Sequence, residues 1–303
     1  MNSENTKNVV AITNLTRQFD EQLALDDVSI NVKSGQVFGI VGENGAGKTT
    51  LIKHMLGQYK AQQGTVTMFD DEPVASPEKV LAKIGYLSEE PELPAWMTVK
   101  EILNYTAAFY PTWDNDYAEQ LIKAFSLNLD KRVRDLSKGQ KARVGLVLAQ
   151  AHKPELLLLD EPSSGLDPNV RRDILSAVIK TVSDEGRTVI LSSHLLEEVE
   201  RVCDHLMMLD KGRVLLFDSM EKVLNNHHRI IAKPDSGISL SDLSKFDGVF
   251  NAGNDNDEWK IDFYGDLEQL KTELDTKSVA IISNRLMSLN DIFISRTSAS
   301  MRG

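Results

Sequence analysis

The sequence predicts an α/β fold, and two features of its apolar pattern lead to that prediction. Short, largely apolar runs occur at residues 37–41, 156–159 and 188–191, and each is followed by Gly, Asp or Ser. Runs of this kind are typical of buried strands in a parallel sheet. Alternating apolar and polar residues at 24–32 and 64–69 indicate half-exposed strands instead. We therefore expect a parallel core sheet with an antiparallel β subdomain attached to it.

Helical patterns separate these strands. Apolar residues recur at three- and four-residue steps through residues 92–132, which predicts a helical insertion that extends to about residue 150. Residues 205–218 are typical of a hairpin whose turn is the sequence DKG. The helical insertion therefore interrupts the core, and the hairpin follows it.

The character of the sequence changes near residue 229. The strands expected beyond this point lie at 229–234, 248–253, 258–265 and 278–283, and the helices at 266–275 and 288–297. A polar run, GNDND, separates two of the strands. We therefore predict two domains, with residues 1–228 forming the larger one and residues 229–303 a small accessory α+β domain.

Composition narrows the classes of function. The chain has 303 residues and a net charge of −11, and this acidic balance argues against nucleic-acid binding, which needs basic surface. Its one cysteine, Cys203, cannot form an intrachain disulfide. No Cys/His cluster has the spacing of a zinc site, and we expect the His227–His228 pair to be solvated. No run approaches the ~18 apolar residues that span a bilayer. We expect a soluble intracellular protein whose membrane spans, if its work needs any, belong to another chain.

A phosphate-binding loop gives the first indication of chemistry. Residues 42–49, GENGAGKT, match the G-x-x-x-x-G-K-[ST] pattern completely and lie between a predicted strand and a predicted helix, as this motif requires. Glycines let the backbone curl so that its N–H groups face phosphate oxygens, Lys48 reaches the outer phosphates, and the Thr49 hydroxyl suits Mg²⁺. The residues expected to bind a nucleotide here are Gly42, Asn44, Gly45, Ala46, Gly47, Lys48, Thr49 and Thr50. The core is therefore predicted to be that of a P-loop NTPase, and a plain glycine-rich turn is the weaker alternative.

An acidic motif completes the expected site. In LLLLDEP, residues 156–162, Asp160 follows the apolar run directly and Glu161 comes next. Asp160 is suited to hold Mg²⁺, and Glu161 is suited to polarise a water molecule as a general base. An acidic pair that only caps the following turn is the alternative, and the complete phosphate loop argues against it.

The segment RDLSKGQKARV, residues 134–144, allows two interpretations. Ser137 and Gln140 fit a capping box, in which two side chains satisfy backbone donors at the start of a helix. The same helix start could hold a phosphate, because its unpaired N–H groups and its dipole favour negative charge. The other motifs are needed to decide between them.

The order of the motifs resembles that of the ATP-binding subunits of ABC transporters. The phosphate loop is followed by DLSKGQ, LLLLDEP, SGLD and a strand that ends in SSH, and the match covers about residues 8–220. The resemblance implies an ATPase that uses ATP and Mg²⁺, in which two subunits pack head to tail around two ATP molecules. It also implies that Ser137, Gly139 and Gln140 serve the ATP held by the other subunit. Capping and phosphate binding are therefore compatible roles for this helix start.

Three further residues take their roles from this resemblance. Phe19 lies where the family has an aromatic ring that stacks on adenine, and a core phenylalanine is the alternative. His194 matches a histidine that contacts the γ-phosphate, and we expect it to act with Glu161 and Lys48 in catalysis; a polar strand end is the alternative. Asp167 matches a loop residue that communicates across the dimer, and it also suits the N-cap position before a proline.

Two residues depart from the family pattern. Glu89 stands where the family usually has a glutamine that touches Mg²⁺ and the attacking water. We hypothesise that Glu89 ligates Mg²⁺ and couples the site to a membrane partner. Lys138 replaces the first glycine of the LSGGQ signature, and it is either a solvated side chain or a source of positive charge near phosphate.

The C-terminal tail indicates a direction of transport. SLNDIFISRT resembles the tail of ATPases from bacterial drug-resistance and sodium-efflux exporters, although an ordinary amphipathic helix would have the same pattern. The resemblance implies export driven through a separate transmembrane permease chain, with this subunit peripheral on the inner face of the cell membrane. The second ATPase subunit could be identical or different. A non-transport ABC ATPase acting on ribosomes or DNA and an importer subunit are the alternatives, and the sequence does not reveal the cargo.

Overall fold

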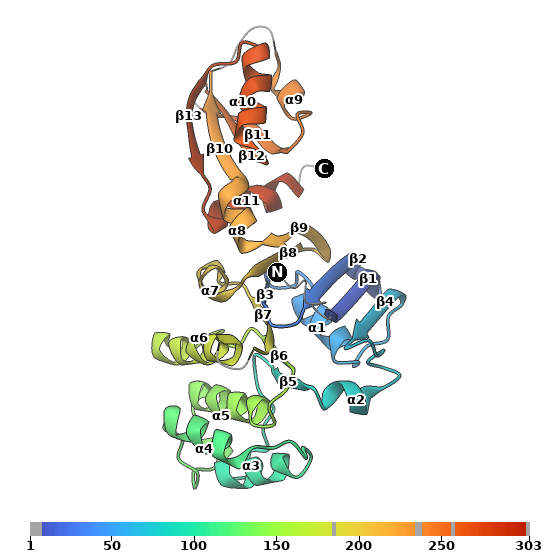
Figure 1. Ribbon diagram of the computed structural model, residues 1–303, viewed down its shortest axis with the longest axis vertical. Coiled ribbons are helices and arrows are strands. Elements are labelled where there is room, and N and C mark those ends of the chain that lie inside the picture. Colours follow the sequence, from blue (N-terminus) through green and yellow to red (C-terminus); the bar gives the residue numbers. More distant parts are fainter. Residues whose placement is uncertain (1–7, 184–185, 234–237, 256–257, 301–303) are drawn as a thin grey trace, which may run out of the picture. The chain divides into compact units, whose positions relative to one another are not determined.

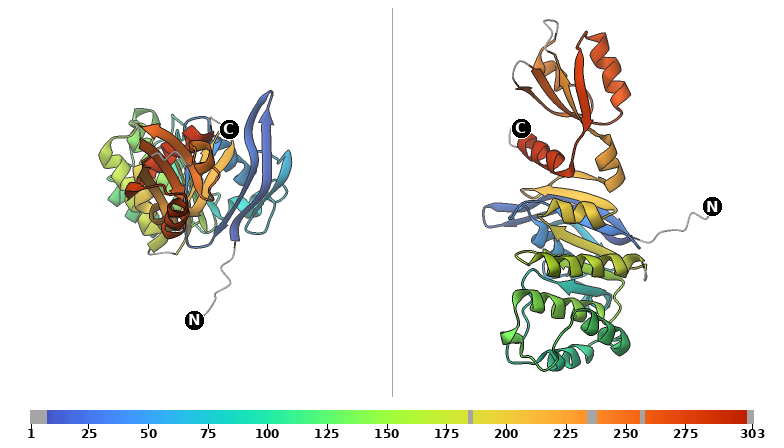
Figure 2. Two further views of the ribbon diagram at one scale, coloured as in Figure 1. Left: turned by 90° about the horizontal axis from the view of Figure 1, so that it is seen from above. Right: turned by 90° about the vertical axis from the view of Figure 1, so that its left-hand side faces the viewer.

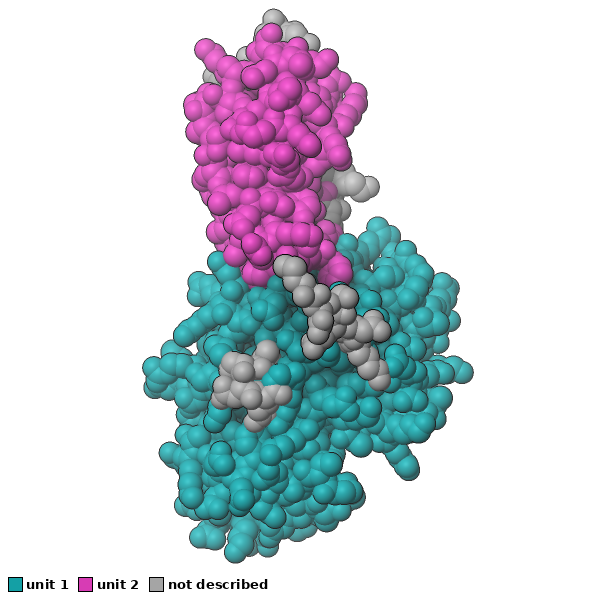
Figure 3. Space-filling model, in the orientation of Figure 1, with its two compact units in different colours: residues 1–214 teal, residues 215–303 magenta. Residues whose placement is uncertain are grey.

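The computed structural model describes residues 8–183, 186–233, 238–255 and 258–300 (Figure 1). The chain forms two compact units, residues 1–214 and 215–303, which are coloured separately in Figure 3. Each unit has an apolar core of its own.

The core sheet of the first unit has six strands, and the division after residue 214 falls within the last of them, β9. Its strand order is β5-β6-β7-β3-β8-β9, and its first five strands pair in parallel. The bounds are β3 Val37–Val41, β5 Ile84–Leu87, β6 Leu156–Asp160, β7 Thr188–Ser193, β8 His205–Asp210 and β9 Arg213–Ser219. Every residue of β3, β6 and β7 is buried, so the three predicted core strands are confirmed. Because parallel strands end at the same edge of a sheet, the segments that follow these three strands lie close together.

A smaller antiparallel sheet has the order β2-β1-β4. Its strands are β1 Asn8–Phe19, β2 Gln22–Lys33 and β4 Gln63–Met68, and β1 and β2 are the long blue strands of Figure 2. This is the predicted antiparallel β subdomain. The sequence pattern did not reveal β1, because its alternation is interrupted. Its pairing with β2 shifts register between Ile12 and Leu15, and Asn14 between them has a φ of 49°.

Helices cover the sheets of the first unit. They are α1 Lys48–Met55, α2 Pro77–Leu81, α3 Val99–Ala107, α4 Asn115–Ala124, α5 Lys138–Gln150, α6 Pro168–Ser183 and α7 Leu196–Val202, with a 3-10 turn at Val133–Asp135. The predicted helical insertion corresponds to α3, α4 and α5, which lie together in Figure 1. α3 begins at a capping box formed by Thr98 and Glu101, and Asp114 caps α4.

A four-stranded antiparallel sheet runs through the second unit in the order β11-β12-β10-β13. Its elements are α8 Met220–Asn226, β10 His227–Ala232, α9 Leu240–Leu243, β11 Val249–Asp255, β12 Glu258–Tyr264, α10 Leu267–Thr276, β13 Ile281–Leu286 and α11 Leu289–Ser300. The expected strand 278–283 is displaced to 281–286, because Ser278 has a φ of 58° and turns the chain at the end of α10. Pro234 of the expected strand 229–234 and residues 256–257 of the polar run lie outside the described residues.

The compact units divide after Val214, whereas the sequence pattern changes near residue 229. Side-chain contacts explain why residues 215–228 group with the second unit. The Tyr264 hydroxyl donates to Asp218 at 2.7 Å, and the Arg296 guanidinium donates to the Leu215 carbonyl at 3.3 Å. These polar contacts join the segment before β10 to β12 and α11.

The expectation that His227 is solvated was wrong, since His227 is fully buried. Its Nε2 lies 3.0 Å from Arg296 Nη2, and because arginine can only donate, Nε2 accepts. Its Nδ1–H therefore donates to the Val223 carbonyl at 2.7 Å. The ring also packs against Phe250 and Tyr264, with centroids 5.5 and 4.4 Å away. The neutral ring is thus a structural part of the second unit.

Acidification is expected to destabilise the second unit through His227. Burial lowers the pKa of His227 to about 4, with the Arg296 charge acting in the same direction. Between pH 6.5 and 4 the unfolded chain therefore binds a proton that the folded unit excludes, so stability falls as the pH drops through this window. At pH 5 the loss is expected to be about 2 kcal/mol relative to pH 7. Urea unfolding of the full chain at both pH values measures it, and His227→Gln should show a smaller pH effect. Equal losses in both proteins would contradict this account.

Candidate nucleotide site

A cavity of about 430 Å³ lies beside the phosphate loop of the first unit. It is lined by residues from β1 and β2, from the loop with the start of α1, and from the segments that follow β5 and β6. These residues are Phe19, Gln22, Ala24, Asn44, Gly45, Ala46, Gly47, Lys48, Thr49, Thr50, Glu89 and Glu161. Most of the residues that the sequence predicts to bind the chain's own nucleotide therefore lie around one cavity.

The phosphate loop has the backbone geometry that its glycines permit. Gly47 has a φ of 109°, and a Cβ there would lie 2.5 Å from the Ala24 carbonyl oxygen. The Lys48 ammonium donates to the Gly42 and Glu43 carbonyls at 2.6 and 3.0 Å. Gly47 precedes α1 and provides no side chain to cap it. The first N–H groups of α1 are therefore available to an anion in the cavity.

Glu161 lies between Lys48 and His194. Its Oε1 is 3.0 Å from Lys48 Nζ, and its Oε2 is 2.7 Å from His194 Nδ1. The carboxylate is almost fully buried, whereas the His194 ring is partly exposed. The backbone at Glu161 has a φ of 48°, a conformation that non-glycine residues rarely adopt and that recurs at functional sites. The three residues predicted to be catalytic thus form one contiguous cluster.

Asp160, at the end of β6, is held by two hydroxyl groups. Ser192 Oγ donates to its Oδ1 at 2.7 Å, and the Thr49 side chain also hydrogen-bonds to it. Burial raises the pKa of Asp160, and the hydrogen bonds from Ser192 and Thr49 oppose that rise. Ser192 additionally accepts the Glu161 backbone N–H at 3.0 Å, so one serine orients both members of the acidic pair.

The residues assigned to Mg²⁺ lie around a neighbouring hollow of about 650 Å³, whose lining includes Thr49, Glu89 and Asp160. Among the described residues, no three His, Cys, Asp or Glu side chains form a group that could hold a metal. Mg²⁺ does not need such a group, because it usually binds one or two carboxylates together with water and substrate phosphates. A hydroxyl and a carboxylate that touch each other beside a phosphate loop fit this partial ligand set.

Phe19 lies at the cavity wall and is only half-buried, so it is not a residue of the apolar core. The Arg17 guanidinium lies 4.4 Å from its ring centroid, and Tyr59 meets it edge-on with centroids 5.5 Å apart. Arg17 also lies 4.8 Å from the Tyr59 ring. This cluster fixes the Phe19 ring beside the phosphate loop.

The signature residues lie elsewhere. Ser137, Gly139 and Gln140 do not line the cavity of their own chain. Ser137 Oγ accepts the Gln140 N–H and Gln140 Oε1 accepts the Ser137 N–H, both at 3.2 Å, so the predicted capping box is confirmed. Ser137 remains exposed at the start of α5. Lys138 is also exposed and lies 3.9 Å from Glu90.

Asp167 forms the N-cap that the sequence allowed for it. Its Oδ1 accepts the N–H groups of Asn169 and Val170 at 3.0 and 3.2 Å, and α6 begins at Pro168. Like Ser137, Asp167 is exposed and does not line the cavity. The signature residues and Asp167, none of which lines the cavity, are therefore the residues that the family resemblance assigns to contacts across a dimer.

Sequence reasoning missed Glu198 of α7, a buried carboxylate that joins three parts of the site. It accepts from Ser163 Oγ at 2.5 Å, just beyond Glu161, and from Ser193 Oγ at 3.4 Å, next to His194. It also forms an ion pair with Arg171 of α6 at 2.9 Å. The only signal in the sequence is its position four residues after His194, which places it in the first turn of the helix that follows.

Replacing Glu198 with Gln should slow turnover without weakening ATP binding. The change removes the charge that holds Arg171 and weakens the contacts behind Glu161 and His194, and small misplacements of catalytic groups cost between about 10- and 100-fold. Steady-state ATPase assays and nucleotide titrations separate the two effects. Glu197→Gln, an exposed neighbour on the same helix, is the matched control. Equal turnover in the two variants would show that Glu198 does not position the site.

Comparisons with known proteins establish the family. A model described as ABC transporter matches residues 25–164. An uncharacterized ABC transporter ATP-binding protein of Synechocystis sp. is 32% identical over 282 residues, covering 89% of this chain and 77% of that protein. The chain belongs to the ABC transporter ATP-binding proteins. This ABC ATPase is also 33% identical to NatA of Bacillus subtilis over 225 residues, which is 71% of this chain and 91% of NatA.

A further relative and two solved structures agree with this assignment. The bacitracin transport ATP-binding protein BcrA of Bacillus licheniformis is 32% identical over 219 residues, covering 71% of this chain and 72% of BcrA. A solved ATP-binding subunit of an ABC transporter matches with a TM-score of 0.66 at 29% identity, covering 71% of this chain and 91% of that one. A dimeric ATP-binding cassette bound to ADP and phosphate has the same fold, with a TM-score of 0.62 at 23% identity and coverage of 70% and 98%. The P-loop NTPase fold is confirmed, and the chain is the ATP-binding, ATP-hydrolysing subunit of a transporter.

Proposed function

We propose that this ABC ATPase dimerises head to tail around two ATP molecules and drives export through a separate membrane-spanning partner. The observation that supports the dimer is that the two halves of the predicted site lie apart in a single chain. The phosphate loop, Phe19 and Glu161 line one cavity, whereas Ser137 and Asp167 are exposed away from it. A second copy, or a related subunit, would supply these residues to the cavity.

Lys48 and the N–H groups at the start of α1 bind the phosphates in this proposal, and Phe19 stacks on adenine. The α1 dipole and the ammonium both favour the polyphosphate. Since Lys48 already contacts Glu161 at 3.0 Å, a γ-phosphate bound by Lys48 lies near the Glu161 carboxylate as well. Arg17, stacked on Phe19, keeps the ring oriented at the cavity wall.

Glu161 then takes a proton from water, and His194 holds the carboxylate in place. The 2.7 Å contact between them orients the Oε2 atom. Thr49 and Asp160 would hold Mg²⁺, which would supply positive charge to offset the charge on the phosphate oxygens. Ser192 hydrogen-bonds to both Asp160 and the Glu161 backbone, so it fixes the positions of the metal ligand and the base relative to each other.

The partner's signature segment completes the closed site. Its Ser137 exchanges the capping contact with Gln140 for a contact with the γ-phosphate, and the N-terminus of α5 faces the negative charge. Gly139 must stay small, because a Cβ there would lie 2.8 Å from a methyl carbon of Val170. ATP hydrolysis would remove the phosphate that holds the two subunits together.

Glu89→Gln tests whether Glu89 is a metal ligand. A carboxylate binds Mg²⁺ more strongly than an amide, so the variant should need a higher Mg²⁺ concentration for half-maximal ATPase activity, by roughly 10-fold. Mg²⁺ titrations at saturating ATP measure this shift. The exposed neighbour Glu90→Gln is the control. An unchanged Mg²⁺ dependence in Glu89→Gln removes Glu89 from the ligand set.

The export assignment rests on the C-terminal tail and on the kind of relative that the chain matches. BcrA is a bacitracin transport protein by name, and the tail SLNDIFISRT has the pattern of exporter ATPases. Among the described residues, no helix is both long and apolar enough to cross a membrane. We infer that the subunit works at the cytoplasmic face of the cell membrane, on a permease supplied by another chain. An importer subunit, or an ABC ATPase that acts on ribosomes or DNA, is the competing assignment.

Co-purification from native membranes tests this proposal. The tagged chain is expressed in its own cell at normal levels, membranes are solubilised in mild detergent, and the captured proteins are identified by mass spectrometry. Recovery of a polytopic membrane chain supports the transport assignment, and uptake or efflux of its cargo in vesicles gives the direction. Recovery of ribosomal proteins without a membrane chain would overturn it and leave only the ATPase.

A further inference from the structure

Four exposed carboxylates lie around the nucleotide cavity of the first unit. Two are in the turn between Phe19 and Gln22, one is next to Asn44 in the phosphate loop, and one lines the cavity itself. None of the four forms an ion pair with another described residue. Because ATP is an anion, these carboxylates oppose its binding unless positive charge is brought to them from elsewhere. We call these residues the acidic rim: Asp20, Glu21, Glu43 and Glu89.

A set of basic residues surrounds the start of α5. Residues 131–141 contain five basic residues and one acidic residue, and none of the five is buried. Lys131 Nζ donates to Gln140 Oε1 at 3.1 Å and Arg132 Nη1 donates to the Trp96 carbonyl at 2.8 Å, so both bond to uncharged groups. Within the described chain, no nitrogen of the five side chains lies closer than 3.8 Å to a carboxylate. We call these residues the basic face: Lys131, Arg132, Arg134, Lys138 and Lys141.

Two members of the basic face are poorly placed for the stability of α5 itself. The positive end of a helix dipole lies at the N-terminus, where acidic side chains are favoured and cations are not. α5 has no acidic residue in its first turn, and it begins with Lys138, followed three residues later by Lys141. An anionic surface that meets this helix start would account for both lysines.

The acidic rim and the basic face lie at the same edge of the core sheet. Glu89 lines the cavity, and the next residue, Glu90, lies 3.9 Å from Lys138. The Lys138 ammonium also lies 3.2 Å from the position that a Cβ at Gly165 would occupy, in the loop that follows Glu161. No member of the basic face lines the cavity of its own chain. The basic face is thus next to a cavity that it does not enter, as head-to-tail pairing of two copies requires.

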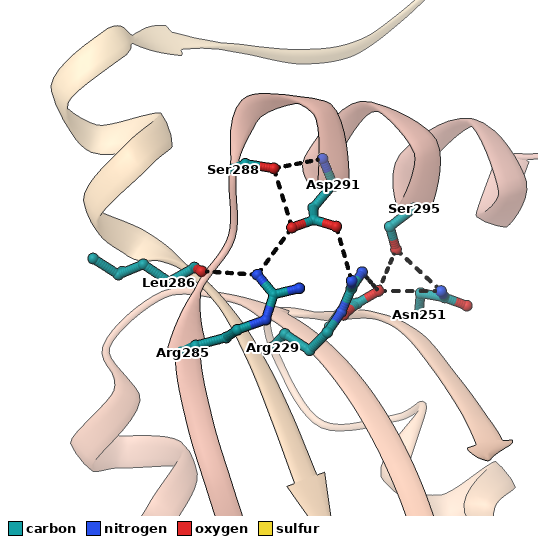
Figure 4. A network of polar contacts seen from close by, with 8 residues as sticks. Arg229, Asn251, Arg285, Leu286, Ser288, Asp291 and Ser295 are labelled. Carbon is teal, nitrogen blue, oxygen red and sulfur yellow. Dashed lines mark hydrogen bonds and ion pairs between the residues drawn. The ribbon is translucent and has the colours of Figure 1, made fainter.

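The charged residues beside α11 in the second unit give a contrast, because they are paired with one another. In Figure 4, Asp291 accepts hydrogen bonds from Arg229 and Arg285, at 3.0 and 2.9 Å. Arg229 also pairs with Asp262 at 2.7 Å. Charges neutralised in this way gain little from a partner, whereas the rim and the face keep charge that a partner can complement.

These opposite charges make the chain complementary to itself. When two copies pack about a two-fold axis, the basic face of one meets the acidic rim of the other, and the reverse contact forms at the same time. Complementary charge of this kind sets the choice of partner and the rate of association. Each copy also carries both a cavity and a signature segment, so neither half of the site has to come from a different sequence.

We propose that the second ATPase subunit is an identical copy of this chain, selected by contact between the basic face and the acidic rim. This inference rests on the proposed head-to-tail dimer and identifies the partner within it. The partner's basic face also offsets the charge of the rim, so the binding of ATP and the pairing of the two copies favour each other. Because salt screens exposed charges, the dimer weakens as the ionic strength rises.

Charge reversal in the purified full chain tests the proposal. Every chain carries Glu161→Gln so that ATP persists, and analytical ultracentrifugation with ATP measures the dimer. One variant adds Lys138→Glu with Lys141→Glu, and the other adds Glu21→Lys with Glu43→Lys. Each variant alone should dimerise roughly 10-fold or more weakly than the parent, because like charges then face each other. An equal mixture of the two should dimerise as the parent does, since each reversed surface meets its complement.

ATP titration in the same preparations separates charge pairing from damage to the fold. The variant with Glu21→Lys and Glu43→Lys gains positive charge beside the cavity, so each chain should bind ATP at least as tightly while the dimer weakens. A damaged protein would lose both properties. Lys33→Glu with Lys180→Glu is the matched control, because both lysines are exposed and belong to neither surface. This control should dimerise as the parent does.

Two outcomes overturn the inference in different ways. A parent chain that stays monomeric with ATP rules out an identical partner. Cross-linking from Ser137→Cys in native membranes then decides the fate of the proposed dimer, because capture of a different ATPase subunit keeps it and capture of none removes it. If the parent dimerises and both reversed variants dimerise equally well, selection by charge is wrong, and the dimer of the proposed function stays in place.

Discussion

Replacing Glu161 with Gln is expected to lower the turnover number for ATP by about 10²–10⁴-fold while ATP still binds. The amide has nearly the same shape, so it can keep the contacts with Lys48 and His194 that the carboxylate makes at 3.0 and 2.7 Å. It cannot accept a proton from water. Binding of the phosphates depends on Lys48 and on α1, which the substitution leaves in place. The loss should therefore appear in kcat and not in the affinity for ATP.

Phosphate release measures turnover, and a fluorescent nucleotide titration measures affinity in the same preparation. Glu155→Gln is a suitable control, because Glu155 is an exposed glutamate directly before β6, at the opposite end from Glu161. A slow variant that retains ATP should also accumulate as an ATP-bound dimer, visible by size-exclusion chromatography. Turnover within twofold of the parent would refute the role of Glu161 as general base, and loss of ATP binding would assign it to binding instead.

The parts of the site that could be predicted from the sequence are those set by local chain geometry. A phosphate loop is one continuous turn between a strand and a helix, so residues 42–49 carry nearly all the information that fixes it. Asp160 and Glu161 were placed correctly because a buried strand ends at its first charged residues. The capping box at Ser137 needs only residues three positions apart. Each of these features depends on neighbours in sequence.

The features that were missed depend on contacts between distant residues. Glu198 is one glutamate among several on α7, and only the fold brings it to Ser163 and Arg171. His227 was expected to be solvated because nothing adjacent to it indicates burial; Phe250 and Tyr264 cover it from other strands. A strand such as β1, with bulges that break its alternation, is likewise hidden from a pattern of period two.

The second large effect is expected for Gly85→Ala, which should lower the free energy of unfolding of the first unit by about 3 kcal/mol. Gly85 lies in β5 beneath the last turn of α5. A Cβ there would lie 1.9 Å from the Ala149 carbonyl oxygen and 3.0 Å from Pro154. The obstacle is backbone, so neither a rotamer change nor a flexible side chain can relieve the overlap. Either β5 or α5 must move.

Movement of α5 would also displace Ser137 at its other end, so Gly85→Ala should reduce ATPase activity at temperatures where the chain is still folded. Gly145→Ala gives the matched control, because it lies in the same contact between α5 and β5 but meets side chains and no backbone: the flexible end of Leu87 at 2.6 Å and a ring carbon of Pro91 at 3.3 Å. That change also gains about 1 kcal/mol of helix propensity, so its net effect should be near zero. Urea unfolding followed by a probe in the first unit compares the two. If Gly85→Ala proves as stable as Gly145→Ala, β5 and α5 are not packed as closely as the structure has them.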